Sequence, residues 1–194
     1  MNPPGPTPRT IERPKFTIDD VLERTARGQV SKRAVLLDGE IYDMPSDGDP
    51  HIEFAMRLQR RISRMLDEDK YFVGVQTTLR LSKFNAPSPD IYVLAGGPPK
   101  GEVAPERILL VIEVADRTLN DDLRDSAGRY ARHGVREFWV IDVKKRRILV
   151  HREPQDGAYP EPRIIESAGS IEALLIPELS VMLDAIVQIG RAHV

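Results

Sequence analysis

The chain of 194 residues contains no cysteine, which excludes disulfide bonds and thiolate-bound metal sites. No apolar run approaches the roughly 20 residues that cross a bilayer, and the N-terminus lacks the apolar core of a signal peptide. We therefore expect a cytoplasmic protein that does not enter a membrane. The net charge is −2, which argues against a protein that coats nucleic acid through a large positive excess. One face of the molecule can still be basic.

Several catalytic signatures are also absent. The sequence has no Walker loop, no GxGxxG, no GxSxG and no paired histidines with zinc-site spacing. It therefore shows no sign of nucleotide binding, serine hydrolysis or zinc hydrolysis. With 30% charged and 41% hydrophobic residues, the composition is that of a single domain with an ordinary core.

Two carboxylates stand at the ends of two apolar segments. Asp90 opens a strand expected over residues 89–94, and Glu113 lies near the end of a strand expected over residues 108–114. In an antiparallel pair, the start of one strand lies beside the end of the other. Both carboxylates would then meet at one edge of a sheet, an arrangement that suits a hard divalent cation.

The N-terminal region predicts three elements. Residues 1–14 hold five prolines and are expected to form a disordered or extended arm. A short helix follows, with Thr17 as its cap and Gly28 after its end. The Asp38–Gly39 dipeptide lies between apolar runs, which predicts a β-hairpin.

Residues 50–67 have the apolar spacing of a longer helix. The same helix carries a basic stripe, which we interpret as a solvated face, with a phosphate-contacting face as the alternative. The stripe consists of Arg57, Arg60, Arg61 and Arg64.

The remaining pattern alternates strands and helices. Strands are expected at 71–81, 89–94, 108–114 and 137–142, a helix at 119–133, a loop at 95–107, and weaker strands with a terminal helix near 180–187 in residues 158–187. Trp139 is expected in the core. The basic run at 144–147 is interpreted as a turn before a returning strand, with a nucleic-acid patch as the alternative.

The last six residues have a different character. Residues 189–194 can be encoded by a sequence that resembles a sequencing adapter. We therefore predict a non-native tail at 189–194 and exclude His193 from any site.

Four fragments carry a family resemblance. They are residues 37–41 (LDGEI), 89–91 (PDI), 111–116 (VIEVAD) and 130–142 (YARHGVREFWVID). In this order they resemble the Uma-two family of putative restriction endonucleases, within the PD-(D/E)XK nuclease superfamily, over roughly residues 17–187. The resemblance implies an α/β, restriction-endonuclease-like domain over 15–188. Its α-β-β-β-α-β core would have a mixed central sheet flanked by helices and preceded by an N-terminal hairpin.

The resemblance also implies roles for individual residues. Asp90 and Glu113 would be ligands of Mg²⁺ or Mn²⁺. Glu40 matches an upstream acidic position that completes the metal shell or holds a water, although charge beside a hairpin turn is also common. His51 and Gln76 match polar family positions, with surface or strand-edge roles as the alternatives.

One departure from the superfamily concerns its lysine, which normally stands two residues after the glutamate. That position is Ala115 here. Related Uma-type sequences supply the lysine from the next helix, where this chain has Ser126. Asp122, which matches the family aspartate, lies one turn before Ser126, and Arg129 lies on the same face. We predict that Arg129 is the candidate replacement, although a guanidinium deprotonates less readily than an ammonium.

The sequence therefore predicts a metal-dependent DNA endonuclease, either active or weakened by the missing lysine. The alternative is a catalytically inactive relative that binds DNA or a protein partner, and a third interpretation is a dimerisation module. DNA is the expected partner, and a homodimer is a further prediction.

Overall fold

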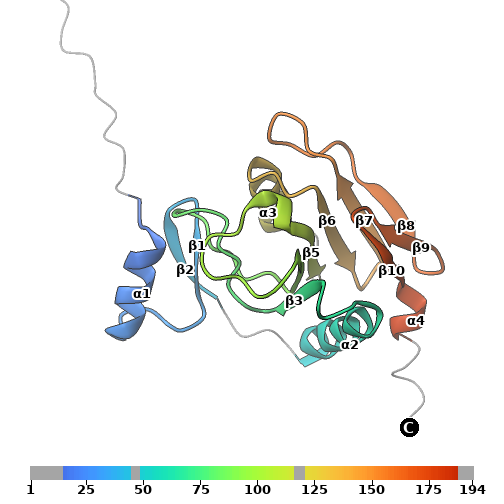
Figure 1. Ribbon diagram of the computed structural model, residues 1–194, viewed down its shortest axis with the longest axis horizontal. Helices are drawn as coiled ribbons and strands as arrows, with labels where there is room; N and C mark the ends of the chain where they lie inside the picture. Colours follow the sequence, from blue (N-terminus) through green and yellow to red (C-terminus); the bar gives the residue numbers. More distant parts are fainter. Residues whose placement is uncertain (1–14, 45–48, 116–120, 188–194) are drawn as a thin grey trace, which may run out of the picture.

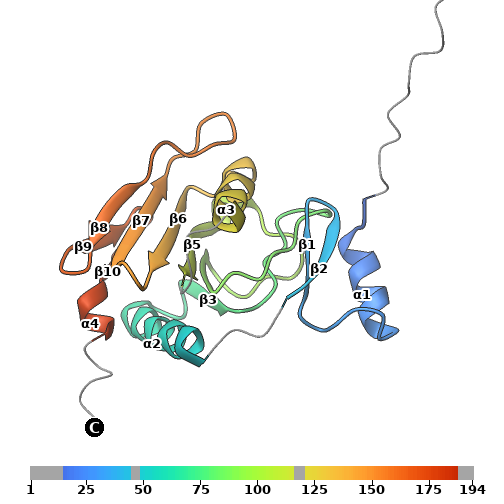
Figure 2. The same cartoon turned by 180° about the vertical axis from the view of Figure 1, so that it is seen from behind.

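The computed structural model describes residues 15–44, 49–115 and 121–187. A six-stranded sheet lies at the centre, with α2 and α3 on opposite sides and α1 with the β1–β2 hairpin at one end (Figures 1 and 2). This is the mixed α/β fold expected from the sequence. The arm predicted at 1–14 and the tail predicted at 189–194 lie outside the described residues.

The order of elements is that of the predicted core. The helices are α1 (Ile18–Ala26), α2 (Asp49–Met65), α3 (Asp121–Arg132) and α4 (Leu183–Val187), with a 3₁₀ turn η1 (Pro105–Arg107). The strands are β1 (Ala34–Leu37), β2 (Glu40–Asp43), β3 (Tyr71–Val75), β4 (Ile91–Ala95), β5 (Ile108–Ala115), β6 (Glu137–Asp142), β7 (Arg147–Arg152), β8 (Arg163–Glu166), β9 (Ser170–Ala173) and β10 (Ile176–Met182). The segment from α2 to β6 follows the α-β-β-β-α-β order.

The central sheet has the strand order β3-β4-β5-β6-β7-β8. Its neighbouring strands are antiparallel except for β5 and β6, which run parallel. Parallel neighbours need a long crossover connection, and α3 provides it. As a result, α3 covers the sheet beside the end of β5, where Glu113 lies.

The N-terminal elements form for the reasons predicted. Thr17 and Asp20 make a reciprocal capping box at the start of α1. The hairpin closes at Leu37 and Glu40 through Asp38 (φ 52°) and Gly39 (φ 85°). Two residues with positive φ make the turn that matches the twist of two paired strands.

The core lies on both faces of the sheet. On one face, α2, α4 and the β9–β10 pair pack against residues such as Ile112, Trp139 and Ile141. On the other, Tyr130 of α3 packs with Val111 and other apolar residues. Because side chains alternate along a strand, Glu113 shares the α3 face with Val111.

A buried acidic residue ties the sheet to its C-terminal extension. Glu137 has no exposed surface, and Trp139 Nε1 and Arg152 Nε donate to its Oε1 over 2.8 and 2.7 Å. Its Oε2 accepts the N–H of Leu174 over 2.6 Å. A buried carboxylate is tolerated only with such partners, so Glu137 links β6, β7 and the β9–β10 connection.

Two basic segments were interpreted from the sequence. The run at 144–147 is a turn leading into β7, as predicted, with Arg146 2.5 Å from Asp184. On α2, Arg57 pairs with Glu53, whereas Arg60 and Arg64 are exposed. This arrangement is compatible with both interpretations of the α2 stripe.

Strand β3 is shorter than predicted. It ends at Val75 rather than at residue 81 because Gln76 adopts a positive φ of 44°, which extended strands do not allow. Residues 77–81 instead continue as irregular chain beside the candidate site. Among the residues described, no helix is both long and apolar enough to cross a membrane.

Candidate active site

Asp90 and Glu113 lie opposite each other at the edge of β4 and β5. The antiparallel register pairs Ile91 with Ile112, which places the preceding Asp90 beside the following Glu113. The N–H of Asp90 donates to Glu113 Oε2 over 3.2 Å, and the N–H of Val114 donates to Asp90 Oδ2 over 2.8 Å. The strand pairing predicted from the sequence is confirmed, and it brings the two carboxylates to one place.

Two further residues predicted for the site contact Asp90. His51 Nε2, near the start of α2, lies 2.8 Å from Asp90 Oδ1. The side-chain amide nitrogen of Gln76 lies 3.5 Å from the same oxygen. The backbone N–H of Gln76 donates to the backbone carbonyl of Asp90 over 3.1 Å. The positive φ of Gln76 thus occurs where its backbone and side chain both contact Asp90, and strained backbone is often found at functional sites.

Tyr130 holds the other carboxylate. Its hydroxyl donates to Glu113 Oε1 over 3.0 Å, and its side chain is 1% exposed on α3. Tyr130 opens the fragment 130–142 that carries part of the family resemblance. The sequence gives no sign that its hydroxyl reaches back to β5, because that contact depends on the crossover through α3.

The carboxylate pair is electrostatically costly. Burial, followed by the nearby charge of Asp90, raises the pKa of Glu113 well above its usual value, although the Asp90 N–H and Tyr130 hydroxyl partly oppose this rise. Burial and the Glu113 charge also raise the pKa of Tyr130. A cation between the carboxylates would offset the repulsion between Asp90 and Glu113, which adds to the effect of burial on the pKa of Glu113.

A cavity of about 680 Å³ opens onto the pair. Its polar wall includes His51, Gln76 and the hydroxyl residues Thr77, Thr78 and Ser88. The remaining lining includes residues of the α1–β1 connection and the hairpin region, namely Lys32, Arg33, Ala34, Val35 and Met44. Two cationic residues therefore line the same cavity as the two carboxylates.

The donor set fits a hard divalent cation that is only partly enclosed by protein. Asp90 and Glu113 offer carboxylate oxygens and, within residues 15–44, 49–115 and 121–187, no group of three His, Cys, Asp or Glu side chains converges on a metal position. Mg²⁺ commonly binds one or two carboxylates and completes its shell with water and substrate phosphate. Asp90 and Glu113 fit that mode.

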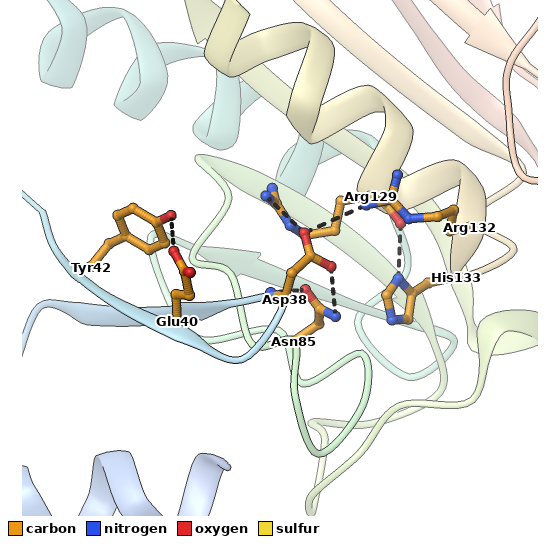
Figure 3. Close-up of polar contacts among 7 residues, drawn as sticks. All are labelled: Asp38, Glu40, Tyr42, Asn85, Arg129, Arg132 and His133. Atoms are coloured by element: carbon orange, nitrogen blue, oxygen red, sulfur yellow. Dashed lines mark hydrogen bonds and ion pairs between the residues drawn. The ribbon is translucent and has the colours of Figure 1, made fainter. Parts of the chain in front are cut away.

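Glu40 and Arg129 lie in a separate cluster between the hairpin and α3 (Figure 3). Arg129 and Arg132 each lie 3.5 Å from Asp38 Oδ2, while Glu40 accepts a hydrogen bond from Tyr42 over 2.8 Å. These residues line a different cavity, of about 440 Å³. The structure therefore groups Glu40 and Arg129 with each other and not with the cavity of Asp90.

The two positions expected to carry the lysine lie elsewhere. Ala115 is buried at the end of β5, and Ser126 is half-buried on α3 outside the residues that line the Asp90 cavity. Asp122 belongs to α3, but its side chain lies outside the described part of the chain. Among the described residues that line the Asp90 cavity, Lys32 is the lysine. Its position before the hairpin gave no sign of this in the sequence.

The comparison with protein families agrees with this geometry. Residues 21–185 match the Uma2 family, described as putative restriction endonuclease. The chain belongs to this family. Asp90, Glu113 and Tyr130 all fall within the Uma2 match, whereas curated proteins give no match.

A solved structure supports the fold. The chain is similar to a crystal structure of a putative nuclease belonging to DUF820 from Anabaena variabilis, with a TM-score of 0.71 and 15% identity. The alignment covers 89% of this chain and 98% of that one. At this identity the likeness shows a shared fold for nearly the whole chain.

The raised pKa of Glu113 predicts a pH dependence without metal. A carboxyl whose pKa is higher in the folded state than the usual 4.5 contributes stability below about pH 4.5 and loses it as pH rises through the folded pKa. We expect this contribution to disappear in Glu113→Gln. Urea unfolding in EDTA at several pH values gives the free energy of unfolding of the wild type and of Glu113→Gln. The difference between the two should fall as pH rises, and a difference that does not change with pH would contradict the expectation.

Proposed function

We propose that this protein is a metal-dependent DNA endonuclease that hydrolyses phosphodiester bonds with Mg²⁺ or Mn²⁺. The observation that carries the proposal is the cross-strand placement of Asp90 and Glu113 in a cavity that Lys32 and Arg33 also line. Membership of the Uma2 family supports a nucleic-acid substrate.

The residues of the chain would prepare the site for the cation. Asp90 is oriented by the Val114 N–H and by His51, and Glu113 by Tyr130 and the Asp90 N–H. Such surrounding hydrogen bonds fix ligand direction and raise metal affinity. When bound, the divalent cation supplies Lewis acidity toward the phosphodiester oxygens and lowers the pKa of water.

Lys32 is the proposed source of the positive charge. The superfamily lysine is replaced by Ala115, and Arg129 is paired with Asp38 in another cavity. Lys32 lines the cavity of the carboxylate pair. A flexible ammonium there is suited to offset charge on the phosphate as the bond breaks.

The test of the function is nicking of supercoiled plasmid by the purified full chain. We expect nicking with Mg²⁺ or Mn²⁺ and none with EDTA. Equal nicking with and without EDTA would exclude the proposed chemistry.

A variant series tests the source of the charge. We expect Lys32→Ala to lower the nicking rate by about 100–1,000-fold, the usual effect of losing one group that stabilises charge in the transition state. Adding Ser126→Lys should raise the rate again, because Ser126 lies one helical turn before Tyr130, whose hydroxyl contacts Glu113, and a long lysine side chain can extend toward the carboxylates from there. Lys83→Ala is the control, because Lys83 lies over the ring of Phe84 and not in the cavity. An unchanged rate in Lys32→Ala, with a loss in Arg129→Ala, would assign the role to Arg129.

A second candidate function is an inactive nuclease fold that binds DNA or a protein partner. The replacement of lysine at both Ala115 and Ser126 favours it. Absence of nicking by wild type and Ser126→Lys, together with measurable duplex binding, would support this alternative. The expected homodimer is a separate proposal, which sedimentation of the purified protein tests.

A further inference from the structure

A smaller cavity adjoins the candidate active site. It has a volume of about 410 Å³ and is lined by Thr78, Arg80, Pro99, Lys100 and Gly101. Thr78 also lines the cavity of Asp90 and Glu113. The two cavities therefore meet at Thr78, which lies on the irregular chain that follows Gln76.

The adjoining cavity carries uncompensated positive charge. Arg80 is half-buried and Lys100 is exposed, and none of the described residues that line the cavity with them is acidic. Among the described residues, neither side chain forms an ion pair, in contrast to Arg129 and Arg132, which both pair with Asp38. Their charge is available to an external anion.

The backbone around these two cations is held in place. The carbonyl of Arg80 accepts the N–H of Val103 over 2.8 Å. Within the loop that carries Lys100, Arg107 donates to the carbonyls of Ala95 and Gly97 over 3.1 and 2.6 Å. The loop is therefore tied at several points, and it presents Lys100 beside Arg80 without needing a ligand to order it.

We propose that Arg80 and Lys100 each bind a backbone phosphate of the DNA strand, next to the phosphodiester placed at Asp90 and Glu113. The strand would run from Lys32, across the carboxylate pair, to Arg80 and Lys100. This inference rests on the proposed function, because it takes the carboxylate pair as the cleavage position. Phosphate contacts of this kind set register on the strand without reading its sequence.

The exposed arginines of α2 provide the competing binding surface. Arg60 and Arg64 are exposed on one helix, but neither lines the cavity of the carboxylate pair. They carry the same number of positive charges as Arg80 and Lys100. Removing each pair in turn therefore separates a local contact from a general loss of charge.

The experiment measures binding without cleavage. In an Asp90→Asn, Glu113→Gln background in EDTA, a fluorescein-labelled 20-base-pair duplex is titrated at several salt concentrations and followed by anisotropy. Affinity falls with salt, and each lost phosphate contact reduces the magnitude of the slope of log affinity against log salt by about 0.9. We expect the double variant Arg80→Ala, Lys100→Ala to reduce this magnitude by about 2, and Lys100→Ala alone to reduce it by about 1.

The double variant Arg60→Ala, Arg64→Ala should leave the salt slope unchanged, and so should the charge-conserving variant Lys100→Arg. The proposal would be overturned by an equal decrease of the slope in both double variants, by a decrease only in the α2 variant, or by no DNA binding of the parent protein.

The proposed function fails on a different result. If the wild type nicks no plasmid while the slope still depends on Arg80 and Lys100, the DNA-binding surface stands without the enzyme. If it nicks plasmid with no such dependence, the enzyme stands and the strand path is wrong.

Discussion

Asp90→Asn and Glu113→Gln should each abolish the metal-induced rise in melting temperature and lower plasmid nicking by at least about 100-fold. The reason is that the two carboxylates lie opposite each other where β4 begins and β5 ends, and the described residues offer no group of three His, Cys, Asp or Glu side chains that could hold a metal. Loss of either carboxylate leaves a single protein carboxylate and, in a melt without DNA, no substrate phosphate to compensate, so the affinity for Mg²⁺ or Mn²⁺ falls. The effect should therefore be nearly complete for each single variant.

In the metal-free protein, Asp90→Asn should preserve or raise the stability rather than lower it. Neutralising Asp90 removes a charge that raises the pKa of Glu113, so Asp90→Asn should fold normally and match or exceed the wild type in stability in EDTA. Thermal melts with EDTA, Mg²⁺ and Mn²⁺ measure both effects.

Glu40→Gln is the matched control for metal binding. Glu40 matches an acidic family position but lines the cavity of Arg129, so we expect it to keep the metal-induced shift. A shift of wild-type size in Asp90→Asn would remove Asp90 from the metal site. Loss of the shift in Glu40→Gln would instead show that binding draws the hairpin toward β4 and β5.

The second large effect concerns stability rather than chemistry. Glu137→Ala should lower the free energy of unfolding by about 3–5 kcal/mol, the cost of breaking a buried charged pair by removing one partner. Arg152, the Trp139 indole N–H and the Leu174 N–H would all lose their acceptor. For a domain of this size, the melting temperature should fall by about 10 °C. Urea unfolding of the full chain checks the free energy.

The control for Glu137 is another glutamate paired with arginine. Glu153 pairs with Arg136 on the surface, where water screens the charges, so Glu153→Ala should leave the melting temperature almost unchanged. If the two variants melt at the same temperature, the Glu137 network does not stabilise the sheet as its burial indicates.

The sequence predicted the elements whose signals are local. Asp38 and Gly39 determine the hairpin because both adopt positive φ, and Thr17 with Asp20 determines the start of α1. The approach of Asp90 to Glu113 was also predictable, because antiparallel pairing follows from two apolar strands joined by a loop. The family resemblance was confirmed over residues 21–185.

The parts that were not predicted depend on contacts distant in sequence. The early end of β3 follows from the left-handed backbone of Gln76, a conformation that a glutamine does not signal. The hydroxyl of Tyr130 reaches Glu113 only after α3 has crossed the sheet. Lys32 shares a cavity with residues more than fifty positions away, so no spacing rule places it there.

The lining of the candidate cavity has an evolutionary consequence. Residues 32–35 and Met44 line that cavity, while Asp90 and Glu113 lie at the edge of the central sheet. The proposed cation Lys32 and the two proposed metal ligands are therefore encoded in separate stretches of the chain. Exchange of the first 44 residues between relatives would change the cation and the apolar lining and leave the metal ligands in place.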